Sequence, residues 1–226
     1  MGIQERRERE KREQRQRILD AALTIINKEG FAALSMRKLA EQIEYSPASI
    51  YLYFENRERI AQELSDAGFE EMLDAISAAI SGKKAVEALH ALGSAYIAYG
   101  VEHPEIYRLV FMGDSDYMAA AYAEHKKYSA ANRAYGVLVQ LADELTESGR
   151  NTQDLPSTVI AEMIWSALHG IVSLHIACPG FQSATPQNMA RFATGMIAQS
   201  FFKPTHATAS PNRKASSTPR APRRKS

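Results

Sequence analysis

The sequence of 226 residues has very little cysteine: Cys178 stands alone, so no disulfide can form within the chain. This composition fits a reducing interior, and we expect a cytoplasmic protein. Residues 1–17 are rich in Arg and Glu but no apolar stretch follows them, which argues against a secretory signal. Hydrophobic residues (45%) and charged residues (23%) occur at the frequencies of soluble globular proteins, so a packed core is expected.

Motifs of the common enzyme classes are also missing. The sequence has no Gly-x-Ser-x-Gly motif, no glycine-rich phosphate loop, and no His-x-x-x-His or Cys-x-x-Cys spacing for a metal. Asp114 and Asp116 stand close together, but loop acids without a basic or metal partner usually serve solvation. We therefore expect no catalysis, no cofactor and no metal.

Signals for β-strands are scarce. Strict apolar alternation is rare and Asn-Gly or Asp-Gly hairpin pairs do not occur, whereas apolar residues recur three and four apart between residues 13 and 202. This periodicity predicts an all-α protein. The expected helices span residues 9–28, 36–43, 47–53, 57–80, 84–102, 104–111, 117–147, 155–177 and 186–202.

Local signals mark several of these boundaries. Gly30 is placed to end the first helix. Ser35 can cap the second helix, and Ser46 followed by Pro47 has the pattern of a cap with proline at the first helical position. Asn56 can cap the helix that follows. The short helices therefore lie close together in the chain, with a three-residue turn between them.

Two short helices joined in this way, after a longer packing helix, predict a helix-turn-helix whose second helix enters the major groove of DNA. The stretches LAEQI (39–43), SPASIYLYF (46–54) and NRERI (56–60) resemble the DNA-binding domain of TetR-type transcriptional regulators. The resemblance extends from about Ile18 to Leu64. It implies a regulator that binds duplex DNA, commonly as a repressor, with activation left open.

The resemblance assigns DNA contacts to the second short helix and its surroundings. Small residues matching Pro47, Ala48 and Ser49 meet base edges in the family, and matching tyrosine and arginine residues hold phosphates. Tyr51 could instead pack on the core, where Phe54 is expected. The candidate DNA-binding residues are Ser35, Arg37, Ser46, Pro47, Ala48, Ser49, Tyr51, Tyr53 and Arg57.

The turn and the charge depart from the family pattern. Glu44 stands where the family usually has glycine, so a positive φ there would cost about 1 kcal/mol, or the turn would shift. Residues 1–84 carry fourteen basic and fifteen acidic residues. Attraction for phosphate must then come from local placement, supplemented by the basic residues between positions 6 and 17.

The last 24 residues, 203–226, carry seven Lys or Arg and no acid, whereas residues 1–202 carry 20 basic and 26 acidic residues. Because this tail has no large apolar side chain, it is expected to be disordered. Two interpretations stay open: a solubilising end, or an electrostatic arm for DNA.

The second half of the chain has the composition of a small-molecule pocket. Seven of the ten tyrosines lie between residues 96 and 135. Apolar walls with a few hydroxyls suit a small organic ligand, although aromatic residues at helical spacing are also typical of a plain core. The candidate ligand-binding residues are Tyr96, Tyr107, Phe111, Met112, Tyr122, Trp165 and His169.

The stretches HPEIYRL (103–109) and WSALHG (165–170) resemble the C-terminal domain of TetR-type regulators that is named for its Trp-His-Gly signature. In that domain the signature helix lines the pocket and the dimer seam. His169 is either a satisfied core histidine or a ligand contact. Gly170 is expected to let another helix approach closely.

Residues 163–180 carry no formal charge. The length of this uncharged segment is at the lower limit for a membrane span. Their flanks lack Lys or Arg clusters and an aromatic belt, so we expect no membrane span but a helix covered by its own domain and by a partner copy. Two copies should pair helices 155–177 and 186–202 as a four-helix bundle.

Such a homodimer would present two recognition helices to a palindromic operator. A ligand would act through helices 57–80 and 104–111, because a small tilt there changes the separation of the recognition helices. An architectural DNA-binding protein without a ligand is the alternative. The expected divisions are a basic arm (1–12), a DNA-binding domain (13–64), a ligand-binding and dimerisation domain (65–202) and the tail (203–226).

Overall fold

The computed structural model describes residues 2–112, 130–147 and 154–201. Within these ranges the regular structure is helical and no strand occurs, which confirms the predicted all-α class. The elements are α1 (Ile3–Glu29), the 3-10 helix η1 (Phe31–Ala33), α2 (Met36–Gln42), α3 (Pro47–Tyr51), α4 (Arg57–Ile80), α5 (Ala85–Glu102), α6 (Pro104–Phe111), α8 (Ala130–Leu145), α9 (Ser157–Ala177) and α10 (Pro186–Phe201).

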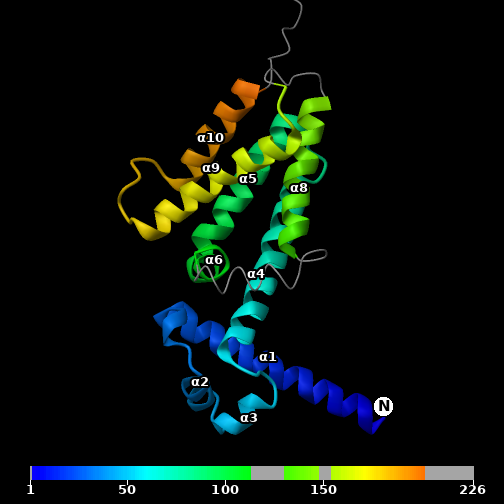
Figure 1. Ribbon diagram of the computed structural model, residues 1–226, viewed down its shortest axis with the longest axis vertical. Coiled ribbons are helices and arrows are strands. Elements are labelled where there is room, and N and C mark those ends of the chain that lie inside the picture. Colours follow the sequence, from blue (N-terminus) through cyan, green and yellow to red (C-terminus); the bar gives the residue numbers. More distant parts are fainter. Residues whose placement is uncertain (1, 113–129, 148–153, 202–226) are drawn as a thin grey trace, which may run out of the picture.

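Helices α1 to α3 form a small unit at one end, and α4 runs from it into a larger helical bundle (Figure 1). Helix α4 packs against α5, α6 and α8, while α10 packs against α5 and α9. The buried apolar residues form one continuous cluster, from Ile18 in α1 to Ala198 in α10. The two units therefore share a core, and α4 is the element that connects them.

The expected helix caps are present. Ser35, Ser46 and Asn56 each accept a hydrogen bond from the backbone N–H three residues further on, at 3.2, 3.2 and 2.8 Å. Each bond satisfies a donor that the first helical turn leaves unpaired. Gly30 ends α1 with a φ of 79°, as expected of a glycine stop. These local signals therefore fix the starts of α2, α3 and α4 at the predicted positions.

Some boundaries differ from the expected ones. Helix α1 begins at Ile3 rather than near residue 9, because side chains four apart in its first half pair with opposite charge. Helix α3 ends at Tyr51, two residues early. Of the helix expected over 117–147, the structure describes α8; residues 117–129 and the tail lie outside the described residues.

Glycines bring helices of the bundle close together. A Cβ atom at Gly100 would come within 2.6 Å of Val172, and one at Gly93 within 2.7 Å of Thr194. Gly170 is different: apart from its own stretch of α9, no atom of the described chain lies within 4 Å of the place its Cβ would take. The expectation of a close helix approach at Gly170 is therefore wrong for contacts within one copy of the described chain.

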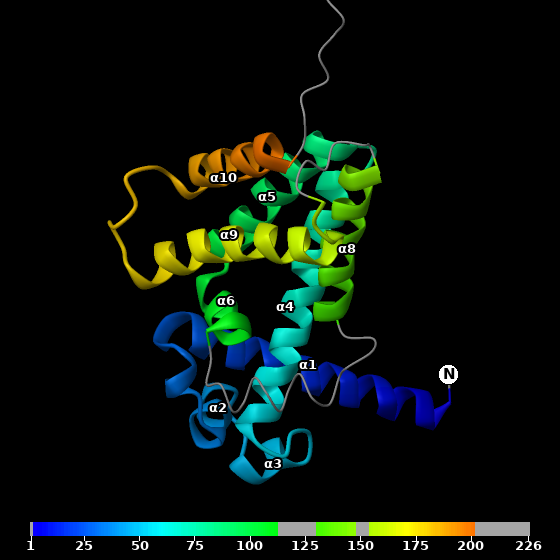
Figure 2. The same cartoon turned by 45° about the horizontal axis from the view of Figure 1, so that its top comes forward.

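Helix α9 crosses α5 and α8 with α10 beside it (Figure 2). Among the described residues it is the one helix long and apolar enough to cross a membrane, judged by length and composition. Core helices of soluble proteins share these properties. The buried side chains of α9, such as Ile160, Ile164 and Leu168, face the bundle core.

Candidate functional site

The outer side of α3 is open to solvent. Pro47 and Ala48 are exposed, and 55% of Tyr51 is accessible. Ile50 is fully buried and Phe54 is 2% exposed, as expected of core residues. The alternative in which Tyr51 packs on the core is therefore wrong, and its ring is accessible for a contact outside the chain.

The turn between α2 and α3 has a left-handed residue that is not glycine. Glu44 has a φ of 59°, in the left-handed region. The N–H of Tyr45 donates to the carbonyl of Ala40 at 2.8 Å, and the N–H of Glu44 donates to that of Glu41 at 3.3 Å. These two bonds form a Schellman motif. Of the two outcomes expected for Glu44, the structure shows the strained φ rather than a shifted turn.

Arg15 fastens the end of α3 to α1 and α4. Its Nη1 donates to the carbonyl of Tyr53 at 2.8 Å, and its Nε donates to Glu63 Oε1 at 3.0 Å. Its Nη2 donates to the other Glu63 oxygen, and the guanidinium carbon lies 4.1 Å from the centre of the Phe54 ring. Arg15 thus positions the recognition helix instead of adding to a free basic surface.

Arg57 has a comparable place at the start of α4. Its Nη1 donates to the carbonyl of Leu34 at 3.1 Å, and its guanidinium carbon lies 5.1 Å from the centre of the Phe31 ring. The Nε donates to Glu58 at 2.9 Å, and 41% of the side chain stays exposed. Arg57 therefore holds the segment before α2 and still reaches the surface.

The remaining candidate residues surround α3. Arg37 is 84% exposed and pairs with Glu41 at 2.9 Å. Ser35 and Ser46 act as helix caps, and the hydroxyls of Ser46 and Ser49 lie 2.8 Å apart. Tyr53 is half-buried. The structure thus brings all the candidate DNA-binding residues to one end of the molecule, in and around α2 and α3 and at the start of α4 (Figure 1).

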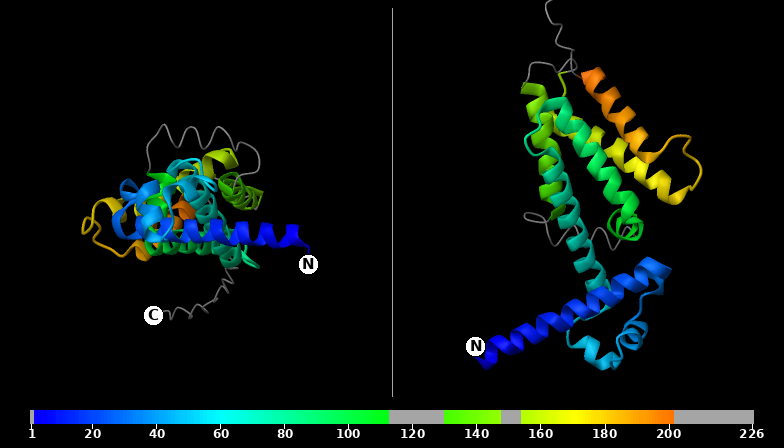
Figure 3. Two further views of the ribbon diagram at one scale, coloured as in Figure 1. Left: turned by 90° about the horizontal axis from the view of Figure 1, so that it is seen from below. Right: turned by 180° about the vertical axis from the view of Figure 1, so that it is seen from behind.

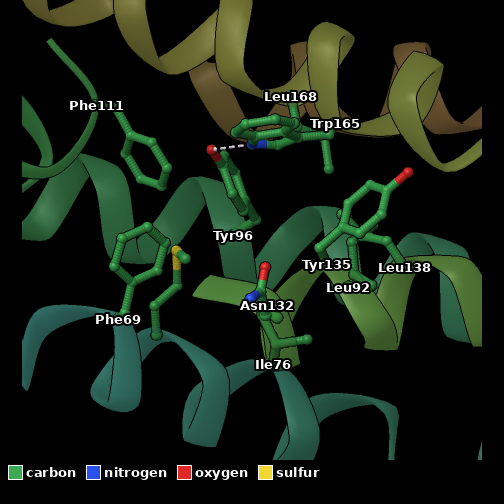
Figure 4. Close-up of a pocket in the computed structure, with 12 residues that line it drawn as sticks. Phe69, Ile76, Leu92, Tyr96, Phe111, Asn132, Tyr135, Leu138, Trp165 and Leu168 are labelled. Carbon is green, nitrogen blue, oxygen red and sulfur yellow. Dashed lines mark hydrogen bonds between the residues drawn. The ribbon is translucent and has the colours of Figure 1, made fainter. Parts of the chain in front are cut away.

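An apolar cavity of about 200 Å³ lies within the bundle (Figure 4). Among the ligand-binding candidates, Tyr96, Phe111 and Trp165 line it. Met112 does not line this cavity, and Tyr122 is outside the described residues. The full lining comprises Phe69, Met72, Ile76, Leu92, Tyr96, Phe111, Asn132, Ala134, Tyr135, Leu138, Trp165 and Leu168.

Tyr107 and His169 lie behind this lining, in a chain of hydrogen bonds. Trp165 Nε1 donates to the Tyr96 hydroxyl at 3.1 Å, and the hydroxyls of Tyr96 and Tyr107 are 2.9 Å apart. The Tyr107 hydroxyl lies 2.7 Å from His169 Nδ1, and His169 Nε2 lies 3.2 Å from the Ser173 hydroxyl. The chain ties α5, α6 and α9 together at one wall of the cavity.

Burial keeps this network neutral. It lowers the pKa of His169 below the ordinary value of 6.5. Burial, and next the neighbouring Tyr96, raise the pKa of Tyr107 far above the usual tyrosine range. A neutral imidazole can accept a hydrogen bond from the Tyr107 hydroxyl at Nδ1 and donate one from Nε2 to the Ser173 hydroxyl. His169 is therefore a half-buried histidine with a hydrogen-bond partner at each ring nitrogen, and its role as a ligand contact stays a prediction.

Phe111 links the cavity to α6. Its ring centre lies 5.2 Å from that of Phe69 in an edge contact, 4.7 Å from Tyr107 and 6.2 Å from Trp165. Phe111 is the last residue of α6, and α6 packs against α4. A change in what fills the cavity can thus reach α6 through Phe111, while Phe69 of α4 lines the same cavity.

Most of the other lining residues were not singled out from the sequence. Phe69, Met72 and Ile76 come from α4 and Leu92 from α5, where their spacing is that of ordinary core residues. Tyr135 belongs to the tyrosine-rich segment, and this composition is the one sequence feature that predicts a cavity wall there.

Two family models match the chain. Residues 18–64 match the bacterial regulatory proteins of the TetR family, and residues 89–200 match the Tetracyclin repressor-like C-terminal domain. The chain belongs to the TetR family. The first match covers the helix-turn-helix and the second covers most of the bundle, including the signature Trp165 and His169. Membership indicates a transcriptional regulator and not an enzyme.

Curated relatives of this TetR-family chain are distant. An uncharacterized HTH-type transcriptional regulator of Mycobacterium tuberculosis, Rv0681, is 25% identical over 166 residues, which is 72% of this chain and 70% of that protein. The uncharacterized regulator YobS of Bacillus subtilis is 26% identical over 95 residues, 42% of this chain. The match spans only half the length of YobS.

Solved structures share the fold. A protein of unknown function from Rhodococcus sp. RHA1 aligns with a TM-score of 0.69 at 21% identity, covering 84% of this chain and 95% of that one. The fatty acid degradation regulator FadR of Bacillus halodurans aligns with a TM-score of 0.66 at 20% identity, covering 81% and 93%. At this level of identity the likeness concerns the fold alone.

Proposed function

We propose that this TetR-family regulator is a cytoplasmic repressor that binds a palindromic operator as a homodimer and leaves it when a small organic ligand binds. The observation that carries the proposal is a combination: an exposed recognition helix at one end of α4 and an apolar cavity lined by the middle of the same helix. A regulator that senses a ligand needs both sites and a rigid connection between them.

The first part of the proposal concerns base and phosphate contacts. Pro47, Ala48 and Ser49 present small side chains at the start of α3, so that base edges can approach closely. Tyr51 and Tyr53 supply hydroxyl donors for phosphate oxygens. Ser35, Arg37 and Arg57 lie at the capped first turns of α2 and α4, where they would contact the phosphate backbone of the same duplex.

The second part concerns the dimer. Large apolar side chains are exposed on α10, where Phe192 and Met196 lie one turn apart at 51% and 64% exposure. On α9, Met163 and Leu174 are 43% and 42% exposed, and Gly170 lies between them on the same face. Pairing these faces across a two-fold axis would bury them and would give Gly170 the close neighbour that a single chain does not supply.

The third part concerns the ligand. None of the described residues lining the cavity is charged, so a charged ligand would lose its hydration without a counter-charge. The polar groups at the wall come from Tyr96, Asn132, Tyr135 and Trp165. This chemistry supports an uncharged, mostly apolar molecule with a small number of hydrogen-bonding groups.

Release from DNA would follow from a shift of α6 against α4. A ligand beside Phe111 changes the position of the end of α6, and α4 carries the helix-turn-helix at its other end. The ligand must bind better to the form with the altered separation of recognition helices, because only such a difference couples the two sites.

Selection of bound fragments from random duplex DNA tests the function. One short palindrome should be enriched, and its half-site spacing should match one or more turns of DNA, about 34 Å each. Enrichment of scattered AT-rich fragments would favour the architectural alternative without a ligand. Failure to enrich any sequence would contradict both. A screen of uncharged apolar compounds for release of the selected duplex then tests the sensor role.

A further inference from the structure

The first half of α1 extends beyond the body of the molecule. All residues from Gly2 to Glu13 are exposed, and the buried residues of α1 begin at Ile18. Figures 1 and 3 show the segment projecting from the helix-turn-helix toward the level of α3, at the end opposite the bundle. This part of α1 leaves the core but stays at the end of the molecule that carries α3. It can therefore contact whatever binds at that end.

The charges on this extension are sorted by face. Arg6 pairs with Glu10 at 2.9 Å, and Arg9 pairs with Glu13 at 3.7 Å. Such pairs four residues apart stabilise an exposed helix. These pairs neutralise Arg6 and Arg9 on one face of the extension and do not include Arg7.

Arg7 and Lys11 lie one turn apart and form no ion pair or hydrogen bond with any residue of the described ranges. With Gln14 they line a shallow groove that also includes Leu52 and Tyr53 at the end of α3. Gln14 itself accepts a hydrogen bond from the Tyr45 hydroxyl, at 2.8 Å, in the helix-turn-helix. The groove therefore joins the extension to the recognition helix.

The position of these cations follows from helix geometry. Residues 3, 7, 11, 14 and 18 follow one another on one side of the helix, and Ile18 of this series packs into the core. Along the second half of α1, this side of the helix packs against the core. Along the first half the same side is exposed, and the residues of the series form a strip that contains no acid. Glu10 also lines the groove, and its carboxylate is paired there with Arg6.

We propose that Arg7 and Lys11 bind phosphates of the operator outside the segment that α3 reads; this inference rests on the proposed DNA-binding function. From Gln14 to Ile3 the helix rises about 16 Å at 1.5 Å per residue. That length corresponds to about five phosphates along one strand. The extension therefore lengthens the contacted DNA on each side of the palindrome without reading its sequence.

Two double variants test the proposal on the full-length protein. Arg7→Ala with Lys11→Ala removes the two cations of the strip, and Arg9→Ala with Arg12→Ala removes two cations from the other side of the same exposed helix. Both variants lose the same net charge, and alanine preserves the helix. Circular dichroism confirms that each is folded before DNA binding is measured.

The readouts are the salt dependence of affinity for the selected palindrome and the hydroxyl-radical footprint. The logarithmic salt slope should fall by about 1.8 per chain for the Arg7 and Lys11 variant, since each phosphate contact contributes about 0.9. Protection of the outermost phosphates should disappear, while the control variant keeps both. Equal slopes for the two variants, or an unchanged footprint, would overturn the inference alone; a wild-type protein that binds no duplex would overturn the proposed function as well.

Discussion

Ile106 on α6 lies directly against Gly68 on α4: a Cβ atom at position 68 would come within 2.6 Å of Ile106 Cγ2 and within 3.2 Å of the Tyr99 hydroxyl oxygen. Contacts as short as the first do not occur between real side chains. A side chain at position 68 therefore requires the Ile106 side chain, or α6 together with it, to shift. This contact lies between the cavity and the helix-turn-helix, on the path that ligand release is proposed to use.

Gly68→Ala should weaken the packing of α6 on α4. We expect a loss of about 1–3 kcal/mol in the free energy of unfolding, because the added methyl group overpacks the contact. We also expect a lower affinity for the selected operator in the absence of ligand. Urea unfolding and fluorescence anisotropy measure the two effects.

Gly136→Ala in α8 is the matched control, since no atom of the described chain lies within 4 Å of its Cβ position. Alanine there should leave stability unchanged or raise it by up to about 1 kcal/mol through helix propensity. Equal effects at the two positions would contradict the importance of the Gly68 contact.

Glu44→Gly should stabilise the protein. Glutamate pays for its φ of 59° in the turn, and glycine adopts this conformation without a Cβ clash. The expected gain is about 0.5–1 kcal/mol, after the greater chain entropy of unfolded glycine is subtracted. Glu44→Ala removes the same carboxylate but keeps the strain, so it should bring no such gain. A Glu44→Gly variant no more stable than Glu44→Ala would show that the turn is not strained.

Arg15→Lys should destabilise the helix-turn-helix although the charge is kept. Lysine cannot reproduce the forked contact with Glu63 and the bond to the Tyr53 carbonyl together. Because both side chains are more than a third exposed, the expected loss is modest, about 1–2 kcal/mol. Arg12→Lys, on an exposed part of the same helix, should change stability by less than about 0.5 kcal/mol. Urea unfolding compares the two, and a silent Arg15→Lys variant would refute the clamp.

His169 should make stability depend on pH. Folding lowers its pKa below 6.5, so the unfolded chain binds more protons between the two pKa values. The free energy of unfolding should therefore fall as the pH drops through about 6.5. In His169→Asn, which cannot titrate and keeps an acceptor for Tyr107, this part of the pH dependence should vanish.

Thermal unfolding over a series between about pH 7.5 and pH 5.5 measures this slope. His175→Asn removes an exposed histidine from the same helix and should keep the wild-type slope. A His169→Asn variant with the full wild-type slope would assign the pH dependence to other groups.

Features set by neighbours in the chain were predictable from the sequence. The caps at Ser35, Ser46 and Asn56 depend on side chains that bond a backbone group three residues away, and the structure has all three. The resemblance left two outcomes open for Glu44, a strained positive φ or a shifted turn, and the structure has the positive φ. The early start of α1 differs from the prediction because pairs such as Arg6 with Glu10 stabilise a helix in a segment whose apolar periodicity is absent.

Features set by residues far apart were not predictable. Arg15 and Glu63 are 48 positions apart, and nothing in either segment indicates the other. Core and cavity residues share the same apolar spacing, so Phe69 could not be assigned to a pocket. Gly170 and Gly68 also look alike in sequence; only the register between packed helices determines that Gly68 is the one in close contact.

The most direct measurement is fluorescence anisotropy of the selected palindromic duplex with Ala48→Glu and Ala78→Glu. Both alanines are exposed on helices, but Ala48 lies on α3 and Ala78 near the far end of α4. A carboxylate on α3 would face bases and phosphates, so Ala48→Glu should abolish specific binding, while Ala78→Glu should bind like the wild type. Undiminished binding by a folded Ala48→Glu variant would contradict the assignment of α3 as the recognition helix.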